Sequence, residues 1–401
     1  MRISIKANSC EPSPMRKFYP LSVKAKAAGK KIYHLNIGQP DIETPKEFHN
    51  AVRNFEYNTL EYEASPGMPL LIESIRNYYM GLGVSLEPED ILITTGGSEA
   101  LLFTFLSILD PNTEVIIPEP YYPNYTTFVH AAGGMIRALH TCPEEGYRYA
   151  DKERIRKLIT KSTRAIMITN PGNPTGVTLT QEQMRMIADI AKENNLFLIS
   201  DEVYREFCYD DTYGIPTMGR FSDISENLVI IDSVSKRFSA CGARIGCVIT
   251  KNKELQQALL KFCQARLSVA TIDQLGAAAL YQVDPSFFTK CKEEYRARRD
   301  VVVNGLRSIP GVVVEEPMGA FYLMASLPVD NSDDFQRWLL EEFDDGGETV
   351  MFAPAAPFYE TPGSGINEVR IAYVLKEDDL KRAIELLRLA IERYRKDVMG
   401  K

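Results

Sequence analysis

Short apolar runs rich in Ile and Val alternate with longer helical patterns up to about residue 290. The runs that read as strands buried on both faces are "DILITTGG", "EVIIPEP", "RAIMITNP", "LFLISDE", "LVIIDSVSK" and "RIGCVIT". Between them, "SEALLFTFLSIL" and "TQEQMRMIADIAKENN" have the longer apolar period of helices. Strands and helices that alternate in this way indicate a mostly parallel sheet covered by helices. The pattern therefore predicts an α/β fold.

After about residue 290 the pattern changes. A charged helix, "KCKEEYRARRDVVVNGLRSI", precedes strand-like "GVVVEE" and "GAFYLMA", a helix near "SDDFQRWLLEEF", the strand "EVRIAYV" and a long amphipathic C-terminal helix. We interpret this part as a smaller α+β domain that the N-terminal segment completes. The expected division is a large domain over residues 46–288 and a small domain built from residues 1–45 and 289–401.

Composition narrows the class of protein. The 401 residues are 45% apolar and 25% charged, as in ordinary globular enzymes, and carry a net charge of −8. That charge disfavours a nucleic-acid partner, and no apolar run has the length of a membrane span or a signal-peptide core. The seven cysteines are scattered and lack a C-x-x-C pair, which favours reduced thiols over disulfides or a zinc site. We expect a cytoplasmic protein with no metal, membrane or nucleic-acid partner.

Polar or special residues follow the predicted strands. Ligands of open parallel sheets bind outside the carboxyl ends of the strands, so we expect these residues to share one edge. They are Gly97 and Ser98 after "ILITT", Tyr122 after "VIIPEP", Asn173 in "NPGNPTG", Asp201 and Tyr204 after "LFLIS", and Ser233 and Lys236 after "LVIID". This edge is the predicted site.

Lys236 lies in "SVSKRFSACGARIGC", where small residues allow a ligand to come close to the backbone. A lysine amine condenses with an aldehyde to form a Schiff base, and pyridoxal phosphate is the cofactor that uses this chemistry. Asp201 at the end of a buried strand needs a cationic partner, and the protonated pyridine nitrogen is one. Taken singly, the features have structural alternatives: Asp201 as a cap or ion pair, Tyr204 as a core residue, and Ser98 as the N-cap after a turn. Their common edge and the lysine favour the cofactor.

The lysine block "SVSKRFSACGARIG" resembles the signature of class I aminotransferases, the fold type I pyridoxal-phosphate enzymes related to aspartate aminotransferase. "NPGNPTG", "SDEVY", "LNIGQPDIETP" and "YEASPGMPLL" match other blocks of that family in order and spacing. The resemblance extends from about residue 30 to the C-terminal helix. It implies a large domain with a mostly parallel, seven-stranded type of sheet between helices and a smaller α+β domain.

The resemblance also implies roles at the cofactor. Lys236 would hold the cofactor covalently and move the proton, Asp201 would pair with the pyridine nitrogen, and Tyr122 would stack on the ring. Tyr204 and Asn173 would bond the phenolic oxygen. The residues implied at the phosphate are Gly97, Ser98, Ser233, Arg244 and, from the neighbouring subunit, Tyr62. The last of these implies a homodimer with shared sites.

For the substrate, the resemblance implies that Arg370 in "NEVRIAYV" takes the α-carboxylate through a two-pronged set of hydrogen bonds. Gly38 in "NIGQPD" and Asn173 would contact the same substrate. The chain departs from the family at Tyr122, where relatives often have Trp or Phe, and at Ala355, which replaces a glycine in "PAAPF". In the family, the stretch that matches "QARLSVAT" often carries substrate-specificity residues from the partner subunit. Arg266 in that stretch has two interpretations: it reads a side-chain carboxylate, or it is a solvated surface residue.

The leading hypothesis is ping-pong transfer of an amino group from an L-amino acid, with aspartate among the candidates, to a 2-oxo acid such as 2-oxoglutarate. The alternative enzyme is a β-C–S lyase or another pyridoxal-phosphate reaction on this fold, including a racemase-like activity. A third hypothesis is a ligand-sensing regulator, which would need a basic DNA-binding region, and we expect no room for one before Gly38. Aspartate and glutamate are natural donors if Arg266 enters the pocket, and neutral or aromatic donors if it does not.

Overall fold

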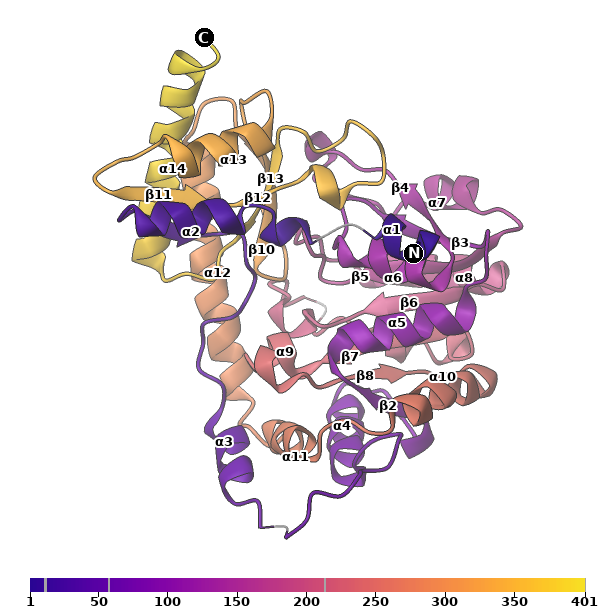
Figure 1. Cartoon of the computed structure of the whole chain (residues 1–401). Helices are drawn as coiled ribbons and strands as arrows, with labels where there is room; N and C mark the ends of the chain where they lie inside the picture. The colour runs from indigo at the N-terminus through magenta and orange to yellow at the C-terminus, as the bar shows by residue number, and fades with distance from the viewer. Residues whose placement is uncertain (11–12, 57, 213, 401) are drawn as a thin grey trace.

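The computed structural model describes residues 1–10, 13–56, 58–212 and 214–400, and within them a seven-stranded sheet dominates the architecture (Figure 1). Its strand order is β2-β8-β7-β6-β5-β3-β4. The strands are β2 (Ile91–Thr94), β3 (Glu114–Pro118), β4 (Met135–Leu139), β5 (Thr163–Thr169), β6 (Phe197–Asp201), β7 (Leu228–Ser233) and β8 (Gly246–Ile249). The six strands expected from the apolar runs are confirmed. β4 was not expected, because this edge strand is only partly buried and has no continuous apolar run.

Strand direction decides which residues meet at the sheet edge. β4, β3, β5, β6 and β7 pair in parallel, whereas β8 is antiparallel to both β7 and β2. The mostly parallel α/β fold is therefore confirmed. Because β8 runs backwards, its first residue, Gly246, pairs with Thr94 and Ser233 at the ends of β2 and β7. The residues that precede β8 thus reach the same edge as those that follow the other strands.

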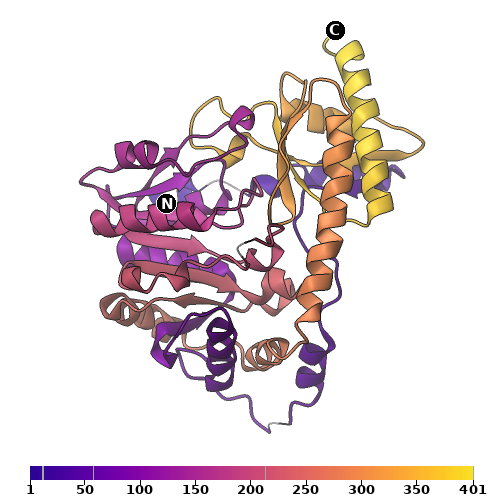
Figure 2. The ribbon, with the colours of Figure 1, turned by 180° about the vertical axis from the view of Figure 1, so that it is seen from behind.

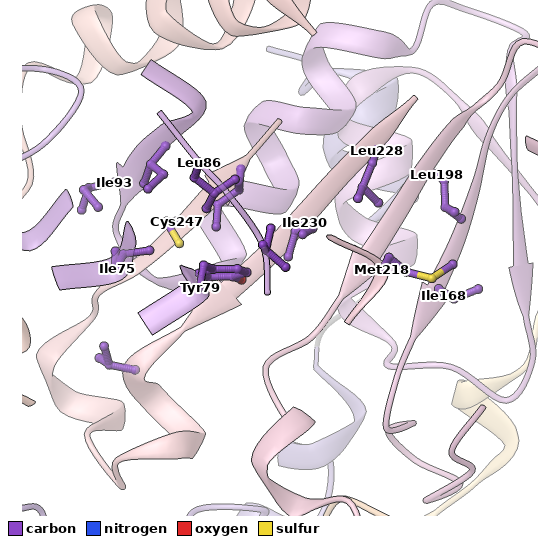
Figure 3. Packing of buried hydrophobic residues seen from close by; sticks show 14 of the residues in the cluster. Ile75, Tyr79, Leu86, Ile93, Ile168, Leu198, Met218, Leu228, Ile230 and Cys247 are labelled. Atoms are coloured by element: carbon purple, nitrogen blue, oxygen red, sulfur yellow. The ribbon is translucent and has the colours of Figure 1, made fainter. Parts of the chain in front are cut away.

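Helices cover both faces of this sheet, because successive residues of each central strand point to opposite faces and both sets are apolar. Val229 and Ile231 pack with α5 (Gly96–Ile108), α6 (Asn124–Ala132) and α10 (Lys253–Arg266). Leu228 and Ile230 pack on the other face with α4 (Pro69–Gly81), α7 (Lys152–Leu158), α8 (Gln181–Glu193) and α11 (Thr271–Leu280). Figure 3 shows this second layer around Ile230, with Tyr79 of α4 close by.

A second part of the molecule lies beside the large sheet (Figures 1 and 2). It contains an antiparallel sheet of β12 (Ala353–Pro354), β13 (Glu368–Ala372), β10 (Tyr322–Ser326) and β9 (Val313–Val314). The long helices α12 (Ser286–Arg307) and α14 (Glu377–Asp397) lie side by side here, with α13 (Ser332–Glu341) nearby. The helices and strands expected after residue 290 are present, although β9 is shorter than its apolar run.

Part of the N-terminal segment packs on this second part, whereas its first helix, α1 (Ile5–Ser9), contacts α6 of the large part. β1 (Lys31–His34) pairs in parallel with β11 (Glu348–Met351), and Phe18, just before α2 (Tyr19–Ala27), is buried against Met351. The remaining helices are α3 (Lys46–Arg53) and α9 (Val234–Arg237). Across the described residues, no helix has both the length and the apolar character needed to cross a membrane.

The position of the domain boundary remains a proposal. Phe287, in the first turn of α12, packs against the buried clusters of both parts, whereas Cys291 and Tyr295 belong to the second cluster alone. We therefore propose to keep the division at residues 46–288 against 1–45 and 289–401.

Candidate active site

A pocket of about 290 Å³ opens at the carboxyl edge of the large sheet, between it and the second part of the molecule. The sheet edge and the segment around Gly38 supply most of its wall, and β10, β13 and the 3-10 turn Pro14–Arg16 supply the rest. The pocket brings together all of the sequence-predicted site residues except Tyr62 and the candidate Arg266. They are Gly38, Gly97, Ser98, Tyr122, Asn173, Asp201, Tyr204, Ser233, Lys236, Arg244 and Arg370.

Lys236 reaches the pocket from α9, a single helical turn that begins where β7 ends. Ser233 fixes this turn, since its hydroxyl accepts from the backbone N–H of Ser235 and donates to the carbonyl of Ile245. The Lys236 amine donates to the carbonyl of Gly38 at 2.8 Å and lies 3.8 Å from the Cys241 sulfur. The amine is therefore held at the pocket wall by one main-chain contact, which leaves it capacity for a further partner.

Asp201 ends β6 and is only 5% exposed. Its carboxylate accepts from the Tyr125 hydroxyl at 2.6 Å and from the backbone N–H of Val203 at 3.3 Å. No cationic side chain among the described residues forms an ion pair with it. Burial raises the pKa of Asp201 to about 6, although the bond from Tyr125 opposes that rise. A buried carboxylate that faces a pocket and has no cationic partner of its own is suited to a cationic ligand.

Another part of the pocket wall is suited to an anion. Gly97 and Ser98 lie at the start of α5, where backbone N–H groups have no partner within the helix. Gly96 has φ +74°, and a Cβ there would lie 2.3 Å from Nη2 of Arg244. Gly246 also leaves no room for a side chain, because a Cβ added there would lie 2.5 Å from the carbonyl carbon of Gly96. The small residues thus let the Arg244 guanidinium lie against the helix start.

Arg370 on β13 is 3% exposed and points its guanidinium into the pocket. Nη1 donates to the side-chain oxygen of Asn173 at 3.1 Å, and Nη2 donates to the carbonyl of Asn36 at 2.7 Å. The ring of Tyr322 lies 4.5 Å from the guanidinium carbon, and Nε is buried without a hydrogen-bond partner. Among the described residues, no carboxylate pairs with Arg370, so the site can accept one from a ligand.

A chain of hydrogen bonds runs through two tyrosine hydroxyl groups, from Asn173 to the backbone of Gly38. The Tyr204 hydroxyl accepts from the Asn173 amide at 3.4 Å and lies 3.2 Å from the Tyr322 hydroxyl, which donates to the carbonyl of Gly38. Burial raises the pKa of Tyr204 well above its ordinary value, so this hydroxyl stays protonated in the ligand-free site. It is available as a hydrogen-bond donor to a ligand oxygen.

Sequence reasoning missed Tyr125 and Tyr322. Tyr125 contacts Asp201 directly and meets the ring of Tyr122 edge-on at 5.5 Å. Its spacing of three residues from Tyr122, at the start of a helix that follows a strand, was a usable signal. Tyr322 gave no such signal, because its position in an apolar strand, "GAFYLMA", is that of a core residue.

Two predicted residues lie outside the pocket. Tyr62 is 80% exposed on the segment between α3 and α4. The Arg266 guanidinium donates to the carbonyl of Ile93 at 3.1 Å and lies 3.7 Å from a carboxylate oxygen of Glu99, and its side chain is 15% exposed. The interpretation of Arg266 as a solvated surface residue is therefore wrong. Arg266 also does not enter this chain's own pocket, because the loop before α4 and the end of β2 occupy its guanidinium.

Comparisons with known proteins identify the family of this chain. The sequence family described as aminotransferase class I and II matches residues 30–387. The aspartate aminotransferase of Pyrococcus horikoshii is 32% identical over 90% of this chain and 91% of its own length. The aspartate/prephenate aminotransferase of Thermus thermophilus is 29% identical over 96% and 97% of the two chains.

Solved structures give the same result. The Thermus thermophilus aspartate aminotransferase crystallised with maleate superimposes with a TM-score of 0.88 at 29% identity, over 97% of this chain and all of that one. The aspartate aminotransferase of Thermotoga maritima has a TM-score of 0.86 at 26% identity over the same shares. The chain thus belongs to the class I and II aminotransferase family, and it is an aminotransferase of the fold type I class.

Proposed function

We propose that this aminotransferase uses pyridoxal phosphate, bound at the carboxyl edge of the large sheet, to move an amino group from an L-amino acid to a 2-oxo acid. Class I aminotransferases depend on this cofactor. The proposal for this chain rests on one observation: the Lys236 amine and the buried carboxylate of Asp201, which forms no ion pair with any residue that the structure describes, line the same pocket.

The residues of the pocket fit the cofactor at each of its polar groups. Asp201 would face the ring nitrogen, whose positive charge removes the cost of burying the carboxylate. The tight approach of Arg244 to the Gly96–Gly97 turn provides a cradle for the phosphate, with Ser98 and Ser233 beside it. Tyr204 and Asn173 would bond the phenolic oxygen, and Tyr122 offers a flat ring face.

When bound, pyridoxal phosphate supplies an electron-accepting ring. The chain's own residues would hold and position the substrate. Arg370 would take the α-carboxylate, using the buried Nε that now lacks a partner, while the Gly38 backbone approaches the same group. Lys236 would then carry a proton to and from the α-carbon, because its amine lies in the same pocket on a short, fixed turn. Asp201 would keep the ring nitrogen protonated.

The proposed reaction is ping-pong, with 2-oxoglutarate as a candidate acceptor. Several relatives are named for aspartate or for aspartate and prephenate, which makes these the first compounds to assay. A panel of L-amino acids with 2-oxoglutarate should yield glutamate without ammonia. Release of ammonia together with pyruvate would instead indicate the β-C–S lyase.

We further propose a homodimer in which Tyr62 reaches the phosphate of the neighbouring subunit. The exposure of Tyr62, 80% on a segment that projects between α3 and α4, supports this role. We also propose a cytoplasmic location, which the seven free cysteines support.

The test of the proposed function is the attachment of the cofactor. Borohydride reduction of the purified enzyme, followed by peptide mapping, should place the pyridoxal group on Lys236. A label on any other lysine would overturn the assignment. The Lys236→Ala variant should still bind pyridoxal phosphate, measured by equilibrium dialysis, but lose nearly all turnover, since it lacks both the attachment and the proton carrier.

A further inference from the structure

A buried carboxylate of the large part holds a loop of the second part. Glu119 directly follows β3, and its side chain is fully buried. Its Oε2 accepts from the backbone N–H groups of Glu360 at 2.7 Å and Thr361 at 3.0 Å, and its Oε1 accepts from the Thr361 hydroxyl. Both oxygens of this carboxylate therefore bind the loop that joins β12 to β13, residues 355–367.

Two further hydrogen bonds join the same two segments. The backbone N–H of Tyr121 donates to the carbonyl of Phe358 at 2.9 Å, and the Tyr121 hydroxyl donates to the Glu360 carboxylate at 3.0 Å. The next residue, Tyr122, lines the pocket. The β12–β13 loop is thus fastened to the sheet edge at which the cofactor would bind.

The fastened loop carries Phe358, which contacts the proposed α-carboxylate arginine. The Phe358 side chain is fully buried, and its ring centroid lies 5.3 Å from the guanidinium carbon of Arg370. A ring at this distance attracts the cation and limits its movement. Glu368, two residues before Arg370 on β13, accepts from the Tyr359 hydroxyl of the same loop at 2.7 Å. The loop therefore contacts both the guanidinium and the strand that carries it.

We propose, on the basis of the function proposed above, that Glu119 is a positioning residue for Arg370. Its carboxylate docks the β12–β13 loop, the loop holds Phe358 against the guanidinium, and the guanidinium is kept in the geometry that binds a substrate carboxylate. An arginine that is already fixed loses less side-chain freedom when the ligand binds, which favours affinity. Loss of the Glu119 carboxylate should therefore weaken carboxylate binding and leave the attachment of the cofactor at Lys236 unchanged.

Two alkoxyamines test this role on the holoenzyme. Aminooxyacetate and O-methylhydroxylamine both react at the cofactor carbon that Lys236 holds, but only aminooxyacetate has a carboxylate for Arg370. The absorbance of the cofactor reports both rates without turnover. Glu119→Ala should slow aminooxyacetate about tenfold and O-methylhydroxylamine by less than about twofold. Equal slowing of the two compounds, or slowing of neither, would overturn the positioning role.

Arg370→Ala separates a failure of this inference from a failure of the proposed function. The native enzyme should react faster with aminooxyacetate than with O-methylhydroxylamine, and Arg370→Ala should lose that preference. If Arg370→Ala keeps the preference, the assignment of Arg370 to the α-carboxylate fails, whatever the result for Glu119. No absorbance change with either compound, in protein incubated with pyridoxal phosphate, would overturn the cofactor itself.

Three further variants show whether the docking bonds cause the effect. Glu119→Gln keeps an oxygen for the two backbone N–H groups and should react with aminooxyacetate within about threefold of the native rate. Thr361→Val removes the hydroxyl bond at an exposed position, without disturbing the buried carboxylate, and should slow aminooxyacetate about two- to threefold.

Glu114→Ala is the matched control, because it removes a carboxylate that is bonded to Arg137 at the opposite end of β3. It should slow neither compound by more than about twofold. A selective loss with aminooxyacetate in Glu114→Ala would mean that any damage to β3 produces the effect, and it would overturn the specific role of Glu119.

Discussion

Two buried aspartates at the ends of neighbouring strands differ in their partners. Asp232, in β7, is fully buried and receives hydrogen bonds from Arg237, Arg205 and the Tyr79 hydroxyl. Burial alone would raise its pKa, but the two arginines outweigh burial and lower it. Asp201, in β6, is about as buried, contacts no cation among the described residues, and has a raised pKa.

The difference in partners gives the two aspartates different roles, one structural and one functional. Asp232 is paired within the protein, so it holds the start of the Lys236 turn through its bond from the Ser233 N–H. Asp201 and Arg370 are buried charges of opposite sign that face the same pocket and form no ion pair with any residue that the structure describes. A protein that keeps both unpaired loses stability, and a ligand with a cation and a carboxylate restores it.

The largest expected effect is on folding and concerns Asp232. Asp232→Asn should lower the free energy of unfolding by up to about 3–5 kcal/mol, because Arg205 and Arg237 lose the carboxylate that they share. Each arginine keeps one other buried carboxylate, Glu202 and Glu206 respectively. Urea denaturation at pH 7 measures this loss. Asp201→Asn is the matched control and should not destabilise the protein. If both substitutions cost the same, the distinction between the two aspartates would be incorrect.

The next effect is on turnover and concerns Asp201. Asp201→Ala should lower turnover by two to three orders of magnitude, about 3–4 kcal/mol, with little change in fold, because the ring nitrogen would lose the group that keeps it protonated. Asp201→Glu should retain more activity than Asp201→Ala. Circular dichroism verifies the fold of each variant. Equal turnover of Asp201→Ala and the native enzyme would remove the proposed role of this carboxylate.

The pH dependence of apoenzyme stability is the third expectation. The pKa of Asp201 is raised from 3.8 to about 6 in the folded protein. Between those values the folded state binds a proton that the unfolded chain releases, so stability falls as pH rises through this window. The loss, fully present above about pH 6, is about 3 kcal/mol at roughly 1.4 kcal/mol per pKa unit.

Asp201→Asn has no such ionisation and provides the reference. Relative to this variant, the native apoenzyme should lose about 3 kcal/mol of unfolding free energy between pH 4 and pH 7. Pyridoxal phosphate should remove most of that difference by placing a cation beside the carboxylate. Parallel pH profiles for the two apoenzymes would show that Asp201 ionises as freely in the folded protein as in the unfolded chain.

The sequence predicted the sheet and most of the pocket because both follow from local patterns. Central strands such as β7 are apolar on both faces, and the residues that follow them must reach one edge. β4 escaped prediction because its exposure depends on being at the edge of the sheet. Tyr125 and Tyr322 escaped because their roles depend on contacts with Asp201 and Gly38, which are distant in sequence. The position of Arg266 depends on a tertiary contact with β2 that no local pattern encodes.

The smallest expected effect concerns the shared site. A hydrogen bond from Tyr62 to the phosphate bound by the neighbouring subunit would contribute about 1.5–3 kcal/mol, so the Tyr62→Phe enzyme should have reduced activity but should not be inactive.

Co-expression of Lys236→Ala and Tyr62→Phe subunits with two different tags gives purified mixed dimers. In such a dimer one site carries both defects and the other carries neither, so its turnover should approach half that of the native enzyme and exceed both parents. Asp201 and Lys236 come from one chain, so pairing Lys236→Ala with Asp201→Ala should give no such gain and serves as the control. A fully active monomer by light scattering, or mixed dimers no better than the Tyr62→Phe parent, would place Tyr62 outside the active site.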